Sequence, residues 1–285
     1  MNIRATWRRI VPAAFALLAS VAPAAAPQSQ PAAPASGVLI TGRDMALIGA
    51  ATAGSAGLTL FDARIARAFT DSAFHTRHPG FTTAAKRASL VTETVLMLSS
   101  SAVWGIARLT KSPAAADVGL HTFESVASAA MFIQVVRGAL GRARPYVITD
   151  SGQTRDADPH DFQFLHGFTS FNYRSYPSMH AMASFAAATA LVQEMRIRGT
   201  PHRGVYAPLL YTAAVVPGLA RMYLDEHWAS DVVMGVFLGA FSGQKIVDYS
   251  HAHPNNWFDR KFLPRSMRLT VIHGANGFGL TLIPF

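Results

Sequence analysis

Residues 221–231 read RMYLDEHWASD, and the interpretation of the whole chain begins from this stretch. It places Arg221, His227 and Asp231 at spacings of six and four residues. A carboxylate beside an imidazole accepts the proton of one ring nitrogen and leaves the other nitrogen free to attack or to bind. Arg221 adds a positive charge that does not titrate. Taken alone, the pattern fits an ordinary His/Asp pair on a helix surface equally well.

A helix is expected to carry this pair. Asp225 is a typical N-cap residue, and the apolar pattern after it predicts a helix over residues 226–249. His227 would then lie in the first turn, with Asp231 one turn further along the same face.

A second cluster of charge precedes a proline upstream. The pattern predicts a helix over residues 113–144 that stops at Pro145. Arg137 and Arg144 are seven residues apart and would share one face of that helix. Two permanent cations beside apolar neighbours need an anion or carboxylates, unless the helix end is simply solvated. Arg142 is interpreted as a solvated residue of that kind.

The third stretch, residues 177–180, reads PSMH and comes directly before an apolar helical segment. Ser178 is a natural N-cap, and the free N–H groups of the first turn, beginning with Met179, form a ready anion site. His180 in that turn could donate a proton to the same anion. The alternative is a histidine at a helix start with no chemical role.

Together these groups fit phosphoryl transfer without a metal. Arginines hold the non-bridging oxygens, one histidine attacks phosphorus and the other protonates the leaving oxygen. The chain has no cysteine, which excludes disulfides, thiolate catalysis and cysteine-type zinc sites. The acidic residues near the motifs form no obvious hard-cation site, so neither a metal nor another cofactor is predicted.

These motifs resemble the type 2 phosphatidic acid phosphatase family, which shares its fold and anion site with bacterial class A acid phosphatases and vanadium haloperoxidases. The family pattern is K-x6-R-P, then P-S-G-H, then S-R-x5-H-x3-D. Here the corresponding stretches are RGALGRARP at 137–145, PSMH at 177–180 and ARMYLDEHWASD at 220–231. Their order and internal spacings match the family pattern.

The resemblance implies a role for each matching residue. His227 becomes the nucleophile that forms a phosphohistidine, Asp231 orients it, and His180 is the general acid. The phosphate-binding groups would be Arg137, Arg144, Arg221, Ser178 and the backbone N–H of Met179.

Three positions depart from the family pattern. Arg137 replaces lysine, which keeps the charge but changes a point donor into a fork. Ala220 replaces serine and removes a hydroxyl. Met179 replaces glycine, which costs about 1 kcal/mol or more if the backbone needs a positive φ. If the backbone is helical the cost is small, but the side chain could crowd the phosphate.

The rest of the chain predicts an all-α bundle of this family's kind with a short C-terminal β-hairpin around residues 275–277. Further helices are expected over residues 82–109, 179–198 and 205–222. The aromatic residues of the loop before His180 either wall an apolar part of the substrate or pack the loop onto the bundle. They are Phe162, Phe164, Phe168, Phe171 and Tyr173.

The N-terminus is typical of an export signal. Arginines precede an apolar stretch, and a small-residue cleavage pattern follows at residues 22–24. The predicted organisation is a signal peptide over 1–24, a Pro/Ala-rich linker over 25–37, a helical phosphatase domain over 38–262 and a hairpin tail over 263–285. An exported, periplasmic domain is expected, with an uncleaved anchor or a membrane-embedded bundle as the alternatives.

The net charge of +9 favours anionic partners. A phosphorylated small molecule or lipid and an anionic membrane surface fit, whereas no nucleic-acid-binding pattern is present. The predicted function is a metal-independent phosphatase for phosphomonoesters or lipid (pyro)phosphates. A non-catalytic phosphate-binding envelope protein and a vanadate-dependent haloperoxidase are the alternatives; the sequence does not determine the oligomeric state.

Overall fold

The computed structural model describes residues 40–148, 154–156, 158–253, 267–274 and 277–284. Helices dominate this part of the chain, so the predicted all-α class is confirmed. They are α2 (Gly42–Phe69), α3 (Ser72–Arg77), α4 (Pro79–Ala88), α5 (Glu93–Leu109), α6 (Pro113–Leu140), α7 (Met179–Ile197), α8 (Arg203–Tyr223) and α9 (Ala229–Ala252). The predicted signal peptide over 1–24 and linker over 25–37 lie outside the described residues.

Two short antiparallel strand pairs and two 3-10 turns complete the described elements. Strand β1 (Tyr146–Ile148) pairs with β2 (Thr154–Asp156), and the turns η1 (His166–Phe168) and η2 (Phe171–Tyr173) follow in the same connection. Strands β3 (Met267–Gly274) and β4 (Gly277–Pro284) pair where the sequence predicted the C-terminal hairpin.

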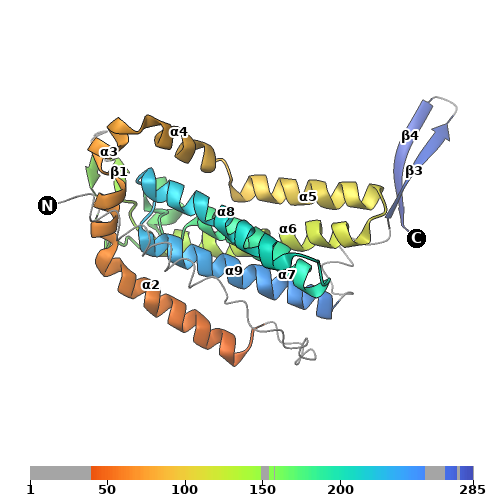
Figure 1. Cartoon of the computed structure of the whole chain (residues 1–285), viewed down its shortest axis with the longest axis horizontal. Coiled ribbons are helices and arrows are strands. Elements are labelled where there is room, and N and C mark those ends of the chain that lie inside the picture. Colours follow the sequence, from red (N-terminus) through yellow and green to blue (C-terminus); the bar gives the residue numbers. More distant parts are fainter. Residues whose placement is uncertain (1–39, 149–153, 157, 254–266, 275–276, 285) are drawn as a thin grey trace.

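Helix α7 is the centre of the bundle and packs against α6, α8 and α9 (Figure 1). Its buried face is built largely from alanines, which let neighbouring helices approach closely. The contact with α9 is closest at Gly239, where an added Cβ would lie 2.2 Å from the carbonyl oxygen of Met182. This close packing brings the starts of α7 and α9 together at one end of the bundle.

Helix α6 ends earlier than the sequence predicts. Gly141 adopts a left-handed conformation, with a φ of 58°, and caps the helix after Leu140. A Cβ on Gly141 would lie 1.8 Å from the carbonyl oxygen of Gln163, so the returning loop also requires glycine there. The prediction that Arg137 and Arg144 share a helix face is therefore wrong, because Arg144 lies in the loop.

Helix α9 begins later than predicted. Asp225 has a φ of 60° and belongs to a turn, whereas Trp228 is the N-cap and the helix starts at Ala229. His227 consequently lies before the helix. The continuous helix predicted over 82–109 is also wrong: α4 and α5 are separate and bent by 53°, and the side chain of Thr92 caps α5.

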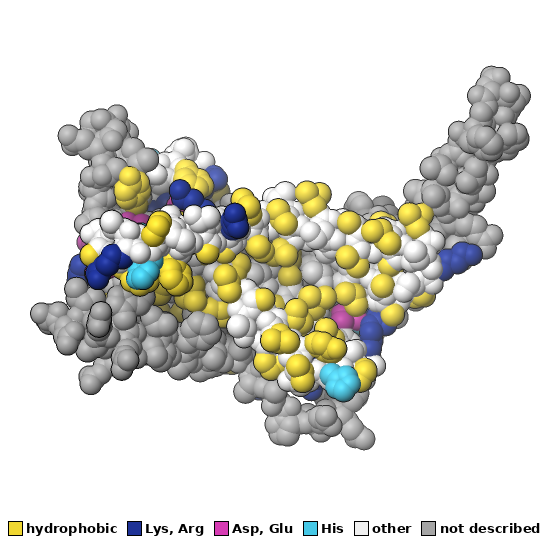
Figure 2. All heavy atoms as spheres, turned by 45° about the horizontal axis from the view of Figure 1, so that its top comes forward, with side chains coloured by type: hydrophobic (Ala, Val, Ile, Leu, Met, Phe, Trp, Pro, Cys, Tyr) yellow, Lys and Arg dark blue, Asp and Glu magenta, His cyan; other side chains and the backbone are white. Residues whose placement is uncertain are grey.

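Three helical segments are long and apolar enough to cross a membrane: residues 42–77 (α2 with α3), α6 and α8. Helices α4 and α5, which meet at a bend, would together form a fourth membrane span if the pair crosses the membrane as a single segment. Figure 2 shows apolar side chains over the middle of the visible face, with charged side chains toward its two ends. These features favour the membrane-embedded alternative over the soluble domain that the sequence predicted. Exposed apolar side chains include Leu60, Phe61, Leu98, Ile106, Phe132, Val135, Leu209 and Val216.

Candidate active site

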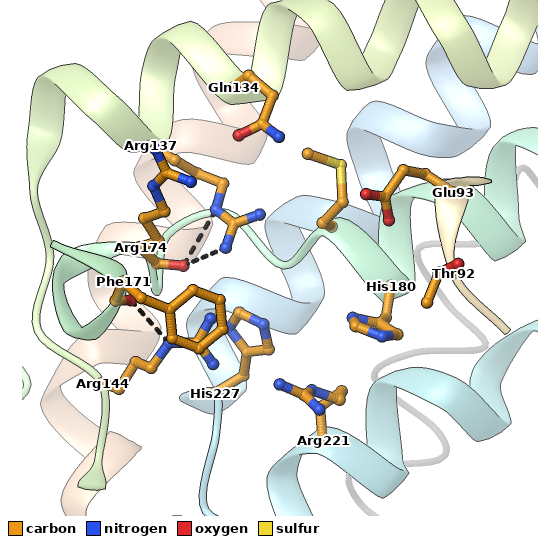
Figure 3. A pocket seen from close by; sticks show the side chains of 11 residues that line it. Thr92, Glu93, Gln134, Arg137, Arg144, Phe171, Arg174, His180, Arg221 and His227 are labelled. Atoms are coloured by element: carbon orange, nitrogen blue, oxygen red, sulfur yellow. Dashed lines mark hydrogen bonds between the residues drawn. The ribbon is translucent and has the colours of Figure 1, made fainter. Parts of the chain in front are cut away.

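The three sequence motifs meet in one cavity of about 260 Å³ at the end of the bundle where α6 and α8 end and α5 and α7 begin (Figure 3). Six of the eight predicted site residues line it. The other two, Ser178 and Asp231, are fully buried. The described residues lining the cavity are Thr92, Glu93, Gln134, Arg137, Arg144, Phe171, Arg174, Met179, His180, Arg221 and His227.

Two of the arginines are held by carbonyl oxygens of the loop between α6 and α7. Nε and Nη2 of Arg137 donate to the carbonyl oxygen of Arg174, at 3.0 and 2.6 Å. Nε of Arg144 donates to the carbonyl oxygen of Phe171 at 3.2 Å, and the Phe171 ring centroid lies 4.1 Å from the guanidinium carbon. These contacts fix both cations against one wall before any anion arrives.

Glu226 joins the second and third motif arginines. Its Oε2 accepts from Nη1 of Arg144 and lies 2.9 Å from Nη2 of Arg221. The backbone oxygen of Glu226 also accepts from Arg144, at 3.1 Å. Nε of Arg221 is buried without a partner among the described residues. The sequence reasoning missed Glu226, although its place directly before His227 puts it beside the site.

The start of α7 supplies the N-terminal part of the site. Met179 is the first residue of the helix and is not among the residues with positive φ, so the strain considered for its replacement of glycine is not present. Its side chain is buried and lines the cavity. The hydroxyl of Ser178 is buried without a partner among the described residues. Nε2 of His180 donates to the carbonyl oxygen of Ser89 at 3.1 Å, which orients the ring.

His227 and Asp231 are neighbours, but their contact is longer than a hydrogen bond. Nδ1 of His227 lies 3.5 Å from Oδ2 of Asp231. That oxygen accepts from the hydroxyl of Ser175 at 2.5 Å and from the backbone N–H of Trp228 at 2.8 Å. Asp231 is therefore fixed by other donors, and its charge faces the ring from a set position.

The interpretation of Arg142 as a solvated helix-end residue is wrong. Arg142 is fully buried and donates to Asp231 at 2.5 Å and to Asp62 of α2 at 2.8 Å. It also donates to the hydroxyl of Ser230 at 2.7 Å and twice to the carbonyl oxygen of Pro159. No local spacing links Asp62 to the motifs, so the sequence offered no signal for this network.

The positive charge of the cavity acts on both histidines. Burial, followed by the charge of Arg221, lowers the pKa of His180 to about 4. Burial and the charges of Arg144, Arg137 and Arg221 lower the pKa of His227 well below its usual value. Both rings are thus neutral at pH 7, and His227 has a nitrogen lone pair available. Burial also lowers the pKa of Arg144, to about 10, which leaves it charged.

Comparison with known proteins finds a family that matches the region of the chain carrying the three motifs. Residues 119–253 match the family described as the PAP2 superfamily. The chain is 37% identical over 70 residues to a lipid A 1-phosphatase of Porphyromonas gingivalis. That match covers 25% of this chain and only 15% of the relative's length.

A solved structure gives a weaker likeness. It is the crystal structure of a transmembrane PAP2 type phosphatidylglycerolphosphate phosphatase from Bacillus subtilis, with 18% sequence identity. The likeness covers 72% of this chain and 98% of the other chain, with a TM-score of 0.36. This score is too low to add to the match by sequence.

Proposed function

We propose that this chain, whose residues 119–253 match the PAP2 superfamily, is a metal-independent phosphatase acting on a phosphorylated lipid. One observation carries the proposal: three motif arginines and two histidines from distant parts of the sequence line a single cavity. Such a cavity suits a phosphate with three non-bridging oxygens, an attacking nucleophile and a leaving oxygen that needs a proton.

In the proposed reaction, Nε2 of His227 attacks phosphorus while the bond to the ester oxygen breaks. His180 transfers a proton to the departing oxygen, which leaves as an alcohol. The phosphorylated imidazole carries positive charge, and the fixed carboxylate of Asp231 near Nδ1 stabilises it. Water then attacks phosphorus, His180 takes a proton from that water, and inorganic phosphate is released.

His180 must gain its proton when substrate binds. Its low pKa reflects burial and the charges of Arg221, Arg137 and Arg144. A phosphate ester brings negative charge next to the ring and so raises that pKa. Equivalently, a neutral His180 can bind the monoanionic ester and take over its proton, which gives the same charge distribution.

The side of the cavity next to His180 is polar. Figure 3 shows Thr92 and Glu93 on this side, away from Arg137 and Arg144. A carboxylate repels phosphate but binds hydroxyl or ammonium groups well. We therefore propose that the leaving alcohol carries such groups close to the ester oxygen, as a sugar or glycerol does.

The surface next to the cavity supports a lipid substrate. Phe171 lines the cavity and is 62% exposed, and Phe164 in the same loop is 75% exposed. Tyr173 is buried and packs the loop, and Phe162, although 39% exposed, lies against the guanidinium of Arg142, so we assign the packing role to these two residues. With the candidate spans, this arrangement favours a bundle in the membrane whose cavity opens at the lipid surface, outside the cytoplasm if the N-terminal segment directs export.

The proposal is tested with the purified full-length chain and three substrates: phosphatidate, an isoprenyl pyrophosphate and a soluble aryl phosphate. Phosphate release that persists in EDTA and disappears in His227→Ala supports it. Vanadate binding without phosphate release would indicate the non-catalytic alternative, and bromide oxidation with added vanadate would indicate the haloperoxidase. The helical backbone at Met179 removes the strain argument for the non-catalytic reading, whereas its side chain lines the cavity, so phosphate release also tests whether it crowds the phosphate.

A further inference from the structure

A second cluster of chemically active side chains lies at the opposite end of the bundle. His121 comes from the first third of α6, Glu194 from the end of α7 and His251 from the end of α9. Nδ1 of His121 lies 2.5 Å from Oε1 of Glu194, and Nε2 of His251 lies 2.8 Å from the same oxygen. The phosphate cavity uses the other ends of α6 and α7, so the cluster is separate from it.

The cluster is buried and charge-selective. His121 and Glu194 are 0% and 1% exposed, while the side chain of His251 is 26% exposed and admits solvent from one side. Arg198 binds the second carboxylate oxygen of Glu194 at 2.8 Å and Asp117 at 3.0 Å. Apart from the two imidazoles, one guanidinium and two carboxylates leave one net negative charge, which suits an added cation.

Glu194 is ionised in this setting. Burial alone would raise its pKa, but hydrogen bonds from His121 and His251 outweigh burial and lower the pKa. Nε2 of His121 has no partner among the described residues, so the contact with Glu194 is the hydrogen bond that orients this ring.

We propose that His121, Glu194 and His251 form a binding site for a divalent transition-metal ion of the zinc class. Two imidazoles and one carboxylate are a zinc ligand set, and a water on the exposed side of His251 completes four-coordination. The three ligand atoms lie within 4.8 Å of one another. Bonds of about 2.0–2.2 Å in tetrahedral geometry require the ligand atoms to be roughly 3.3–3.6 Å apart. The two short contacts must open by roughly 0.5–1 Å, and the two imidazole nitrogens, which lie within 4.8 Å of each other, must come to the same separation, which side-chain rotation provides.

The ion would join three helices at the end remote from the cavity. It would replace two hydrogen bonds to one carboxylate oxygen with three metal–ligand bonds, and its role would be to stabilise the bundle. This site takes no part in the phosphatase reaction, which uses none of the three residues. Metal removal should accordingly lower the melting temperature and leave the turnover of folded protein unchanged.

The experiment uses the full-length protein, dialysed against EDTA and then titrated with Zn²⁺ or Co²⁺. Binding of one equivalent should raise Tm by about 5 °C or more at a hundredfold excess over Kd. Co²⁺ should give the visible absorption of a four-coordinate centre. His251→Ala, at the partly exposed ligand, and Glu194→Gln, which keeps the side-chain shape, should each abolish the rise in Tm and the Co²⁺ spectrum.

Two histidine variants serve as controls. His253→Ala changes a neighbouring histidine outside the cluster, and His227→Ala removes a histidine of the phosphate cavity; both should keep the metal response. The inference is overturned if wild-type protein shows no stoichiometric binding, or if His251→Ala and Glu194→Gln respond to zinc as wild type does. Either result would leave the cluster as a hydrogen-bonded His–Glu–His network only.

Discussion

The pH dependence of turnover is the strongest test of the two histidine roles. The productive complex carries one transferable proton, either on His180 with a dianionic ester or on the ester with a neutral His180. The pKa of His180 in the free site is about 4, and that of a phosphate ester is about 6. Between these values the free enzyme is unprotonated at His180 and the ester is a monoanion, so their encounter brings the single proton required.

For an alkyl phosphate, kcat/KM should therefore be highest between about pH 4 and pH 6. Above pH 6 the ester loses its proton while His180 is already neutral, and kcat/KM should fall about tenfold per pH unit, to about 100-fold below the maximum at pH 8. Below pH 4 both partners are protonated, and kcat/KM should fall again. Titration of His227 should not change kcat/KM in the neutral range, because the pKa of His227 lies well below its usual value.

The assay is kcat/KM from pH 3 to 9 for an alkyl phosphate and for an aryl phosphate with a good leaving group, in wild type and His180→Ala. The aryl ester leaves without a proton, so its decline above pH 6 should be much shallower. The variant should lose the difference between the two substrates. An alkyl profile that rises through pH 6 to 8, or an unchanged profile in His180→Ala, would refute the assignment of His180 as the acid.

Further variants separate the other groups. His227→Ala should abolish turnover and the acid-labile phosphoenzyme with every ester, whereas His180→Ala should lose about 10²- to 10⁴-fold with an alkyl phosphate and far less with an aryl one. Arg142→Lys should lower the free energy of unfolding by about 3–5 kcal/mol, because two buried carboxylates lose the fork that pairs them; a loss below about 1 kcal/mol in urea unfolding would contradict this. Glu93→Gln should lower kcat/KM about tenfold for phosphates of hydroxyl- or amine-bearing alcohols and spare aryl phosphate. Glu93→Asp keeps the charge at the start of α5, but its carboxylate reaches less far into the cavity. If Glu93→Asp distinguishes the two kinds of phosphate as well as wild type does, Glu93 acts only as a charge at the helix start and not as a contact to the leaving alcohol.

The all-α class and the gathering of the motif residues could be predicted from sequence because both depend on short-range order. Helical periodicity identifies α6, α7 and α8 without their partners. The spacings within each motif put Arg137, His180 and Arg221 near helix ends, and the family resemblance puts those ends together. Most of the residues that line the cavity could therefore be predicted from local sequence pattern and the family resemblance.

Helix boundaries and buried partners could not be predicted in this way. Gly141 ends α6 because the loop returns to within contact of its Cα, which no local pattern reveals. Asp225 is a good N-cap by type, but it lies in a turn with positive φ, and Trp228 caps α9 instead. The pairing of Arg142 with Asp62 and the contact of His121 with Glu194 join residues 80 and 73 positions apart. Only the tertiary fold specifies such pairs.

Asp231 shows how the buried network and the proposed chemistry depend on each other. Its Oδ1 accepts from Arg142, and its Oδ2 accepts from Ser175 and from the backbone of Trp228. These donors hold the carboxylate in place 3.5 Å from Nδ1 of His227. A carboxylate already held by three donors needs little reorganisation when the ring becomes positive, which is the preorganisation that favours a charged intermediate. Arg142 therefore supports His227 through Asp231, although it does not line the cavity. The arginine that the sequence placed at a solvated helix end is instead a buried residue that positions the site.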